Sequence, residues 1–235
     1  MTPDEPAPRT VAEERSLTPM RKTIASRLQE SYQQAVHVTN SREVDAEAVL
    51  AAADAAEASD DGVDPSLVDL LLCALSDTLD EYPAFNATFE DGTHRLYEEH
   101  NVGVAVDIDE GLVTPVLAAV GSKSLAEIAA ERRRLTERVR DGDYTMSTFR
   151  GGTFTVSNLG PLGVDSFTPV INPPEVAILG VGRLRERAIP DGDGVAFRQT
   201  MTLDLSFDHR VVDGADAARF LGTLSDNLEA AERYV

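Results

Sequence analysis

One histidine near the C-terminus stands where a side chain could act as a base. His209 follows residues 201–207, an alternating apolar and polar run that predicts a half-buried strand. Asp213 comes four residues later, just before apolar positions that recur at three and four, as in an amphipathic helix. An imidazole titrates near pH 6.5 in model peptides, which suits proton transfer at neutral pH. We therefore expect the chemistry in this connection, with Asp213 placed to cap the helix or complement its charge.

The other three histidines, His37, His94 and His100, lie within or beside predicted strand edges, where a histidine is more often packed or exposed than catalytic. No second His or Cys stands at ligand spacing from His209, so we expect no metal. The acidic, glycine-containing run 191–194 could bind calcium, but it lacks the spacing of an EF-hand and is better explained as a hairpin turn.

The composition excludes several classes of partner. Of 235 residues, 41 are acidic and 21 basic, a formal net charge of −20, and Lys22 and Lys123 are the only lysines. Such a charge repels nucleic acid and anionic membranes, and we predict a halophilic source in which molar salt screens it. An acidic protein from a mesophile is the alternative. There is no apolar run near the roughly 18 residues of a transmembrane helix and no signal-peptide pattern, so we expect a cytoplasmic protein.

Hydrophobic periodicity predicts helices and strands without strict βαβ alternation. Residues 1–16 are rich in Pro, Glu and Thr and are predicted to be a disordered tail or linker, followed by one domain over 17–235. Helices are expected at 19–35, 46–58, 65–80, 125–140 and after Asp213, and strands at 38–44, 86–89, 93–97, 101–108, 112–116, 153–157, 176–181 and 201–207. This mixture favours an α/β (α+β sandwich) fold with a mixed sheet and flanking helices.

The segment from Phe207 to Ala215 resembles the active-site signature of the dihydrolipoyl acyltransferase (E2) subunits of 2-oxo acid dehydrogenase complexes. Their fold is shared with chloramphenicol acetyltransferase. Further segments resemble the same family in the same order, at residues 21–28, 102–107, 111–113, 151–160 and 172–180. The resemblance runs from about Leu17 to the end of the chain and implies a chloramphenicol acetyltransferase-like fold.

The resemblance implies transfer of an acyl group between the thiols of dihydrolipoamide and coenzyme A. His209 matches the family's general base, which would deprotonate a thiol whose pKa is near 8.5. Ser157 matches the hydroxyl that stabilises the tetrahedral oxyanion, and losing one such donor typically costs about 2.7 to 4 kcal/mol of barrier. Asp213 matches an aspartate that pairs with an N-terminal arginine, here Arg21 or Arg27, and helix capping is compatible with that role.

The resemblance also implies partners. The chain would form a homotrimer in which His209 of one subunit faces Ser157 of its neighbour, with a larger cage as an alternative to a free trimer. Coenzyme A is polyanionic and needs a basic mouth. Its candidates are Arg21, Lys22 and the arginines near 132 to 140, of which the following are expected to face solvent: Arg132, Arg133, Arg134 and Arg138.

Two departures from the family pattern leave other hypotheses open. Typical E2 chains begin with a lipoyl domain and a peripheral-subunit-binding domain, which this sequence lacks, so a lipoyl carrier protein and the other 2-oxo acid dehydrogenase components would supply the lipoyl group in trans. Val36 stands where the family usually has proline before His37. The alternatives are a coenzyme A-dependent acyltransferase for another small acceptor and a catalytically weak oligomeric scaffold. The presence of both His209 and Ser157 argues against the scaffold.

Overall fold

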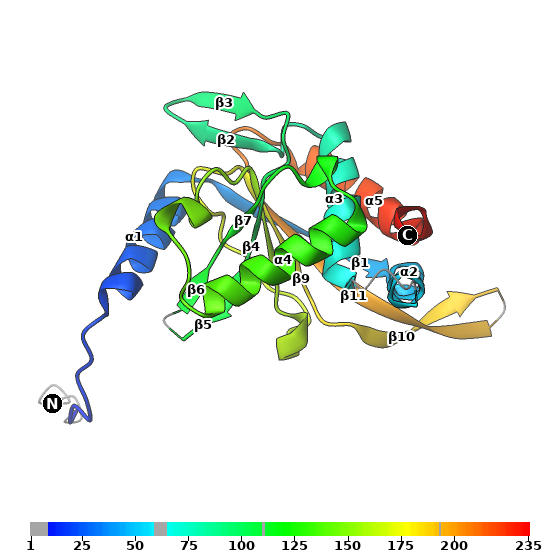
Figure 1. Ribbon diagram of the computed structural model, residues 1–235, viewed down its shortest axis with the longest axis horizontal. Coiled ribbons are helices and arrows are strands. Elements are labelled where there is room, and N and C mark those ends of the chain that lie inside the picture. The colour runs from blue at the N-terminus through cyan, green and yellow to red at the C-terminus, as the bar shows by residue number, and fades with distance from the viewer. Residues whose placement is uncertain (1–8, 59–64, 110, 193) are drawn as a thin grey trace, which may run out of the picture.

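A seven-stranded mixed sheet forms the centre of the computed structural model, which describes residues 9–58, 65–109, 111–192 and 194–235 (Figure 1). Its strands lie in the order β1 (His37–Asp45), β11 (Gly194–Asp208), β9 (Ala177–Val181), β8 (Phe154–Asn158), β4 (Val102–Val104) and β7 (Val116–Leu117), while β10 (Arg185–Asp191) pairs with the first half of β11. The three strands β4, β8 and β9 are parallel to one another, and the remaining pairs are antiparallel. The predicted mixed sheet is therefore confirmed.

Four of the five described α-helices bury an apolar stripe or face in the core. Contacts join α2 (Glu47–Glu57), α3 (Leu67–Glu81) and α5 (Gly214–Glu229) to one another, and α5 also packs on β1 and β11. The five apolar positions that predicted α5 are all buried: Ala217, Phe220, Leu221, Leu224 and Leu228. The predicted capping box opens α4 (Leu125–Arg140), with Ser124 and Glu127 bonded reciprocally. No helix in the described segments is both long and apolar enough for a membrane span.

The first helix, α1 (Pro19–Gln34), stands at one side of the molecule and leads directly into β1 (Figure 1). Thr18 caps it by accepting the N–H of Arg21, and Pro19 occupies the first helical position. Only Ser31 of this helix is buried. The described part of the predicted tail, residues 9–16, is exposed and has neither helix nor strand.

Two predicted strands are wrong as continuous elements. Residues 101–108 divide at Ala105 into β4 and β5 (Val106–Ile108), and residues 112–116 fall into β6 (Gly111–Val113) and β7. Because Pro115 has no N–H, the second segment cannot continue as a fully paired strand. The pair β5 and β6 forms its own small sheet, as does the predicted hairpin of β2 (Ala87–Glu90) and β3 (Thr93–Leu96). Short 3₁₀ helices complete the described elements at Val120–Ser122, Met146–Phe149, Gly160–Leu162 and Ala231–Tyr234.

Arg132 does not face solvent, which corrects the prediction for α4. Its Nε and Nη2 donate to the two carboxylate oxygens of Asp69, at 2.5 and 2.9 Å, and Asp69 is fully buried at the start of α3. Nη2 also donates to Ser66 Oγ at 3.1 Å. The helical pattern of residues 125–140 indicates which face is apolar, but it cannot show that a neighbouring helix presents a buried carboxylate.

Candidate active site

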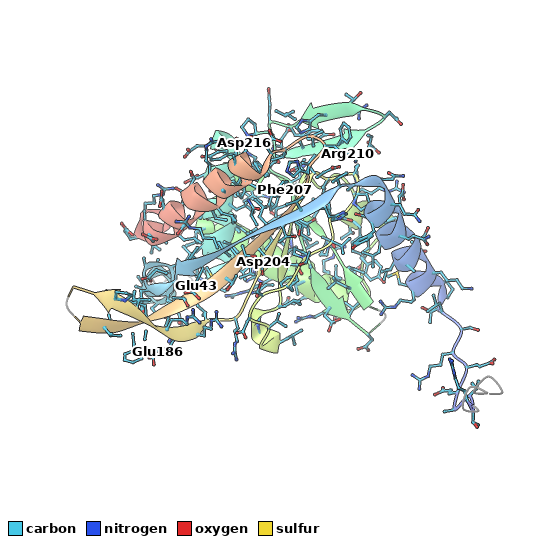
Figure 2. All side chains as sticks on the ribbon, turned by 180° about the vertical axis from the view of Figure 1, so that it is seen from behind. Glu43, Glu186, Asp204, Phe207, Arg210 and Asp216 are labelled. Atoms are coloured by element: carbon cyan, nitrogen blue, oxygen red, sulfur yellow. The ribbon has the colours of Figure 1, made fainter. Side chains whose placement is uncertain are left out.

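The turn that carries His209 is fixed by hydrogen bonds to the start of β1. The N–H of His209 donates to the carbonyl of Val36 at 2.9 Å, and the N–H of Val36 donates to Asp208 Oδ1 at 3.2 Å. Phe207 and Arg210 flank this turn at the end of β11 (Figure 2). The imidazole of His209 lies 5.7 Å from the Phe207 ring, centroid to centroid, and its side chain is 39% exposed. A rigid backbone therefore presents an accessible base.

Asp208 anchors that turn as a buried carboxylate. Burial alone would raise its pKa, but hydrogen bonds from the Arg210 guanidinium and from the N–H groups of Arg210 and Val36 outweigh this effect and hold the pKa of Asp208 below its usual value. The guanidinium also lies over the ring of Phe89, 4.6 Å from its centroid, and so ties the turn to the β2–β3 hairpin.

Asp213 occupies the N-cap position of α5, as predicted, but its side chain accepts no hydrogen bond from the first turn. Its Oδ1 lies 3.8 Å from His209 Nδ1, beyond hydrogen-bond distance, and its side chain is 81% exposed. Arg27 instead donates to the carbonyl of Pro173 at 2.9 Å. Within the described residues of one chain, no ion pair joins Asp213 to Arg21 or Arg27, so the predicted partnership stays a prediction.

Ser157 lies on β8, nearly buried, in the wall of a cavity of about 410 Å³. The cavity is lined by α1, the 3₁₀ turn before β8 and the loop before β9; its larger apolar side chains are Met20, Ile24, Leu28, Leu112, Tyr144, Met146, Phe149, Leu159, Phe167, Ile171 and Ile178. Gly180, the neighbour of Ser157 on β9, leaves room for the Phe167 ring, which would lie 2.8 Å from a Cβ at that position. A hydroxyl in an apolar cavity of this kind suits the stabilisation of a developing negative charge.

Within one chain, the sheet register keeps Ser157 and His209 apart. Ser157 pairs with Gly180, and Gly180 pairs with Asp204, five residues before His209. Five residues of strand span about 16.5 Å and two strand spacings about 9.5 Å, so the two Cα atoms lie about 19 Å apart. His209 does not line the cavity of Ser157. The structure therefore brings His209 and Asp213 together, but it does not bring Ser157 to them in a single copy.

Comparison with known proteins decides what this arrangement belongs to. Residues 10–235 match the family model described as 2-oxoacid dehydrogenases acyltransferase (catalytic domain). The chain belongs to this family. It is 40% identical over 224 residues to the dihydrolipoyllysine-residue succinyltransferase component of the 2-oxoglutarate dehydrogenase complex from Bartonella vinsonii subsp. berkhoffii, covering 93% of this chain and 54% of that protein. This acyltransferase domain thus spans about half the length of the curated relatives it matches.

Solved structures agree with the family assignment and with the predicted fold. The dihydrolipoamide acetyltransferase of Azotobacter vinelandii aligns with a TM-score of 0.91 and 34% identity over 98% of this chain and 99% of that chain. The cubic core of the pyruvate dehydrogenase multienzyme complex gives the same TM-score, identity and coverage. A chloramphenicol acetyltransferase, at 18% identity, aligns with a TM-score of 0.55 over 86% of this chain and 94% of that chain, which confirms the predicted fold.

Each of the other three histidines of the acyltransferase domain lies within hydrogen-bond distance of a neighbouring group. His100 is buried against Ser76, with Nδ1 2.7 Å from Ser76 Oγ, and burial lowers its pKa. His94 Nε2 lies 3.1 Å from the carbonyl of Ala84. His37 Nε2 accepts the N–H of Ile171 at 3.2 Å. Among the described residues, no group of three or more His, Cys, Asp or Glu side chains could hold a metal ion.

Sequence reasoning missed a buried carboxylate close to Ser157. Glu175 accepts the hydroxyl of Thr155 at 2.5 Å and the amide of Asn172 at 2.9 Å, and both partners line the Ser157 cavity. Burial raises the pKa of Glu175 to about 7, although these hydrogen bonds and the nearby Arg27 act to lower it. Its place after two prolines and before an apolar strand was the available signal, because a charge there cannot easily reach solvent.

Proposed function

We propose that this chain transfers an acyl group between coenzyme A and the thiol of a dihydrolipoyl group, with His209 as general base and Ser157 as oxyanion donor. One observation carries the proposal. In the dihydrolipoamide acetyltransferase of Azotobacter vinelandii, a serine, a histidine and an asparagine have a role in the catalytic mechanism, and the serine lies 52 residues before the histidine and the asparagine four after it. Ser157, His209 and Asp213 have the same separations, with aspartate in place of asparagine.

The chemistry follows from the two side chains. The imidazole of His209 takes the proton of the attacking thiol, and the thiolate forms a bond to the thioester carbon. The carbonyl oxygen becomes an oxyanion, which accepts a hydrogen bond from the Ser157 hydroxyl in its apolar cavity. The tetrahedral intermediate then expels the other sulfur as a thiolate, which takes the proton back from the imidazolium.

The Cα atoms of Ser157 and His209 lie about 19 Å apart within one chain, whereas the base and the oxyanion donor must each come within about 3 Å of the same reacting groups. The separation therefore supports a site shared between copies. A homotrimer in which His209 of one subunit enters the Ser157 cavity of the next satisfies this requirement, and a larger cage can be built from such trimers. The exposed imidazole and the cavity that opens beside α1 are both available to a neighbouring copy.

Fewer of the predicted basic residues remain candidates for the mouth that would bind coenzyme A. Arg21 lines the Ser157 cavity, whereas Arg132 is committed to Asp69 and is withdrawn as a ligand for coenzyme A. Val139, at the end of α4, belongs to a small apolar cluster against which Met20 of α1 packs, so the last turn of α4 and the start of α1 meet at this cluster. The lipoyl group would arrive on a carrier protein of a 2-oxo acid dehydrogenase complex. The Bartonella relative is a succinyltransferase and the Azotobacter relative is an acetyltransferase, so the two act with different acyl groups.

An acyl-transfer assay at molar salt tests this function. Purified protein is given acetyl-, isobutyryl- or succinyl-coenzyme A with free dihydrolipoamide, and coenzyme A release is followed. His209→Ala should lower turnover by about 10² to 10⁴-fold. Turnover that survives this substitution would rule out His209 as the base. Absence of dihydrolipoamide acylation with every donor would rule out the reaction itself.

A further inference from the structure

Helix α1 forms one wall of the Ser157 cavity without being packed into the core. Met20, Ile24 and Leu28 of this helix line the cavity, yet only Ser31 of its sixteen residues is buried. Apolar burial usually fixes where a helix lies. Here little apolar surface is buried, so polar contacts must set much of the position of α1 relative to the opposite cavity wall.

Those polar contacts converge on one residue of the opposite wall, Ile171. Ser31 Oγ donates to the carbonyl of Ile171 at 2.6 Å, and the N–H of Ile171 donates to His37 Nε2 at 3.2 Å. Ile171 is 1% exposed and lines the cavity. Arg27 adds a third bond nearby, to the carbonyl of Pro173. Both backbone polar groups of one buried residue are thus satisfied by side chains from α1 and β1.

The ring of His37 is oriented for this contact. Because Nε2 accepts a backbone N–H, the proton of the neutral imidazole is assigned to Nδ1, which lies 3.3 Å from the carbonyl of Ala35. Tyr32 stacks on the ring with centroids 5.5 Å apart and an angle of 27°. Nδ1 therefore bonds to Ala35 at the junction between α1 and β1, and Nε2 bonds to Ile171 in the cavity wall.

The same junction also holds the turn of the catalytic base. His37 is the β1 partner of Asp208, and the adjacent Val36 exchanges two hydrogen bonds with residues 208 and 209. Residues 31–37 are consequently bonded to the Ser157 cavity wall on one side and to the His209 turn on the other.

We propose that Ser31 and His37 are positioning residues, which together clamp Ile171 and so set the width of the Ser157 cavity and its relation to the base-bearing turn. The inference rests on the proposed acyl transfer. Neither side chain touches the reacting atoms. Their effect arises because misplacing a cavity wall by about 1 Å can cost roughly 10²-fold in rate.

Two substitutions of His37 separate the clamp from general packing. In His37→Gln, the longer side chain can present an oxygen acceptor to the N–H of Ile171. In His37→Asn, the shorter side chain can keep the bond to Ala35 but cannot reach Ile171. Ser31→Ala removes the other bond, and Ser26→Ala, on the exposed surface of the same helix, is its control.

The expected result is a drop in kcat of between about tenfold and roughly 10²-fold for His37→Asn and for Ser31→Ala, because losing either bond lets the Ile171 wall shift and a misplacement of about 1 Å can cost roughly 10²-fold in rate. His37→Gln should stay within about threefold of the wild type, and Ser26→Ala should be unchanged. Circular dichroism at the assay temperature confirms that each variant is folded. Hydrogen exchange at the Ile171 amide should accelerate in His37→Asn and not in His37→Gln.

The hydrogen-exchange and kinetic results test separate parts of the proposal. Unchanged exchange at Ile171 in His37→Asn would overturn the clamp itself. Faster exchange with unchanged kcat and KM would overturn its role in positioning. Equal losses in His37→Gln and His37→Asn would show that the ring, not the acceptor, matters, and would also overturn the proposal. A wild-type protein without acyl transfer would overturn the proposed function, whereas the exchange experiment would still report separately whether the clamp exists.

Discussion

Two inactive variants should restore activity to each other if the site is shared between copies. Ser157→Ala removes the proposed oxyanion donor and should lower kcat by about 10² to 10³-fold, and His209→Ala removes the proposed base, with a loss of about 10² to 10⁴-fold. In a cyclic trimer, each site takes its serine from one subunit and its histidine from the next. A trimer that contains both variants can therefore hold an intact site, even though no subunit in it is intact.

The expected recovery follows from random assembly. When the variants are mixed in equal amounts while unfolded and then refolded together, about one site in four joins an intact serine to an intact histidine, so about a quarter of the wild-type kcat should return. Variants that are refolded separately and mixed afterwards, without subunit exchange, should stay at or below about 1% of the wild-type kcat. Coenzyme A release from an acyl-coenzyme A with dihydrolipoamide is the assay. If co-refolding gives no recovery, the reasoning from the separation of about 19 Å is refuted.

Three further predictions concern stability. Arg132→Ala leaves the buried carboxylate of Asp69 unpaired and should lower the free energy of unfolding by about 3 to 5 kcal/mol, whereas the exposed Arg134→Ala should change it little; similar small losses in both would contradict the structure. The pKa of Glu175 is raised to about 7 from its usual 4.5, so its contribution to stability is greatest below about pH 4.5 and is lost as the pH rises to about 7. In urea unfolding, the free energy of unfolding of the wild type should fall by about 3 kcal/mol across that pH range, and Glu175→Gln should abolish this fall. An equal fall in both proteins would contradict the prediction. The halophilic source stays a prediction: the unfolding temperature should rise from low salt to molar potassium chloride, and a flat or falling curve would contradict it.

Local patterns predicted the elements whose sequence signal is local. The stripe of α5 and the capping box at Ser124 are visible in the sequence because they depend on residues three and four apart. The break at Ala105 is not visible in this way. There the N–H of Ala105 donates to Val156 and the N–H of Val104 donates to Pro115, so the path of the strand depends on distant segments. The buried pair of Asp69 and Arg132 escaped prediction for the same reason.

The candidate site shows the same division. His209 could be singled out from its residue type and its place between a strand and a helix, whereas Ser157 lies in an apolar strand that gives no local chemical signal and was found only through resemblance. The resemblance implied that His209 of one subunit faces Ser157 of its neighbour. No local pattern indicated that one chain keeps the two apart, because that separation is set by the sheet order β8, β9, β11. Glu175 was missed because an acidic residue is expected at the surface unless its partners are known.

Val36 now has a physical consequence as a departure from the family pattern. Its N–H donates to Asp208 Oδ1 at 3.2 Å, a bond that proline cannot make. Ala35 already has the extended conformation that precedes proline, with φ −88° and ψ 144°, so Val36→Pro meets no obstacle there. Proline would stabilise by about 0.4 to 1 kcal/mol through the unfolded chain, but the lost bond to a carboxylate is worth about 1.5 to 3 kcal/mol. Val36→Pro should therefore lower the free energy of unfolding, measured with urea, by roughly 1 kcal/mol. Val36→Ala, which keeps the N–H, is the control. A stabilised Val36→Pro variant would show that Asp208 does not depend on this bond and that the hydrogen bonds from Arg210 are enough to hold its carboxylate.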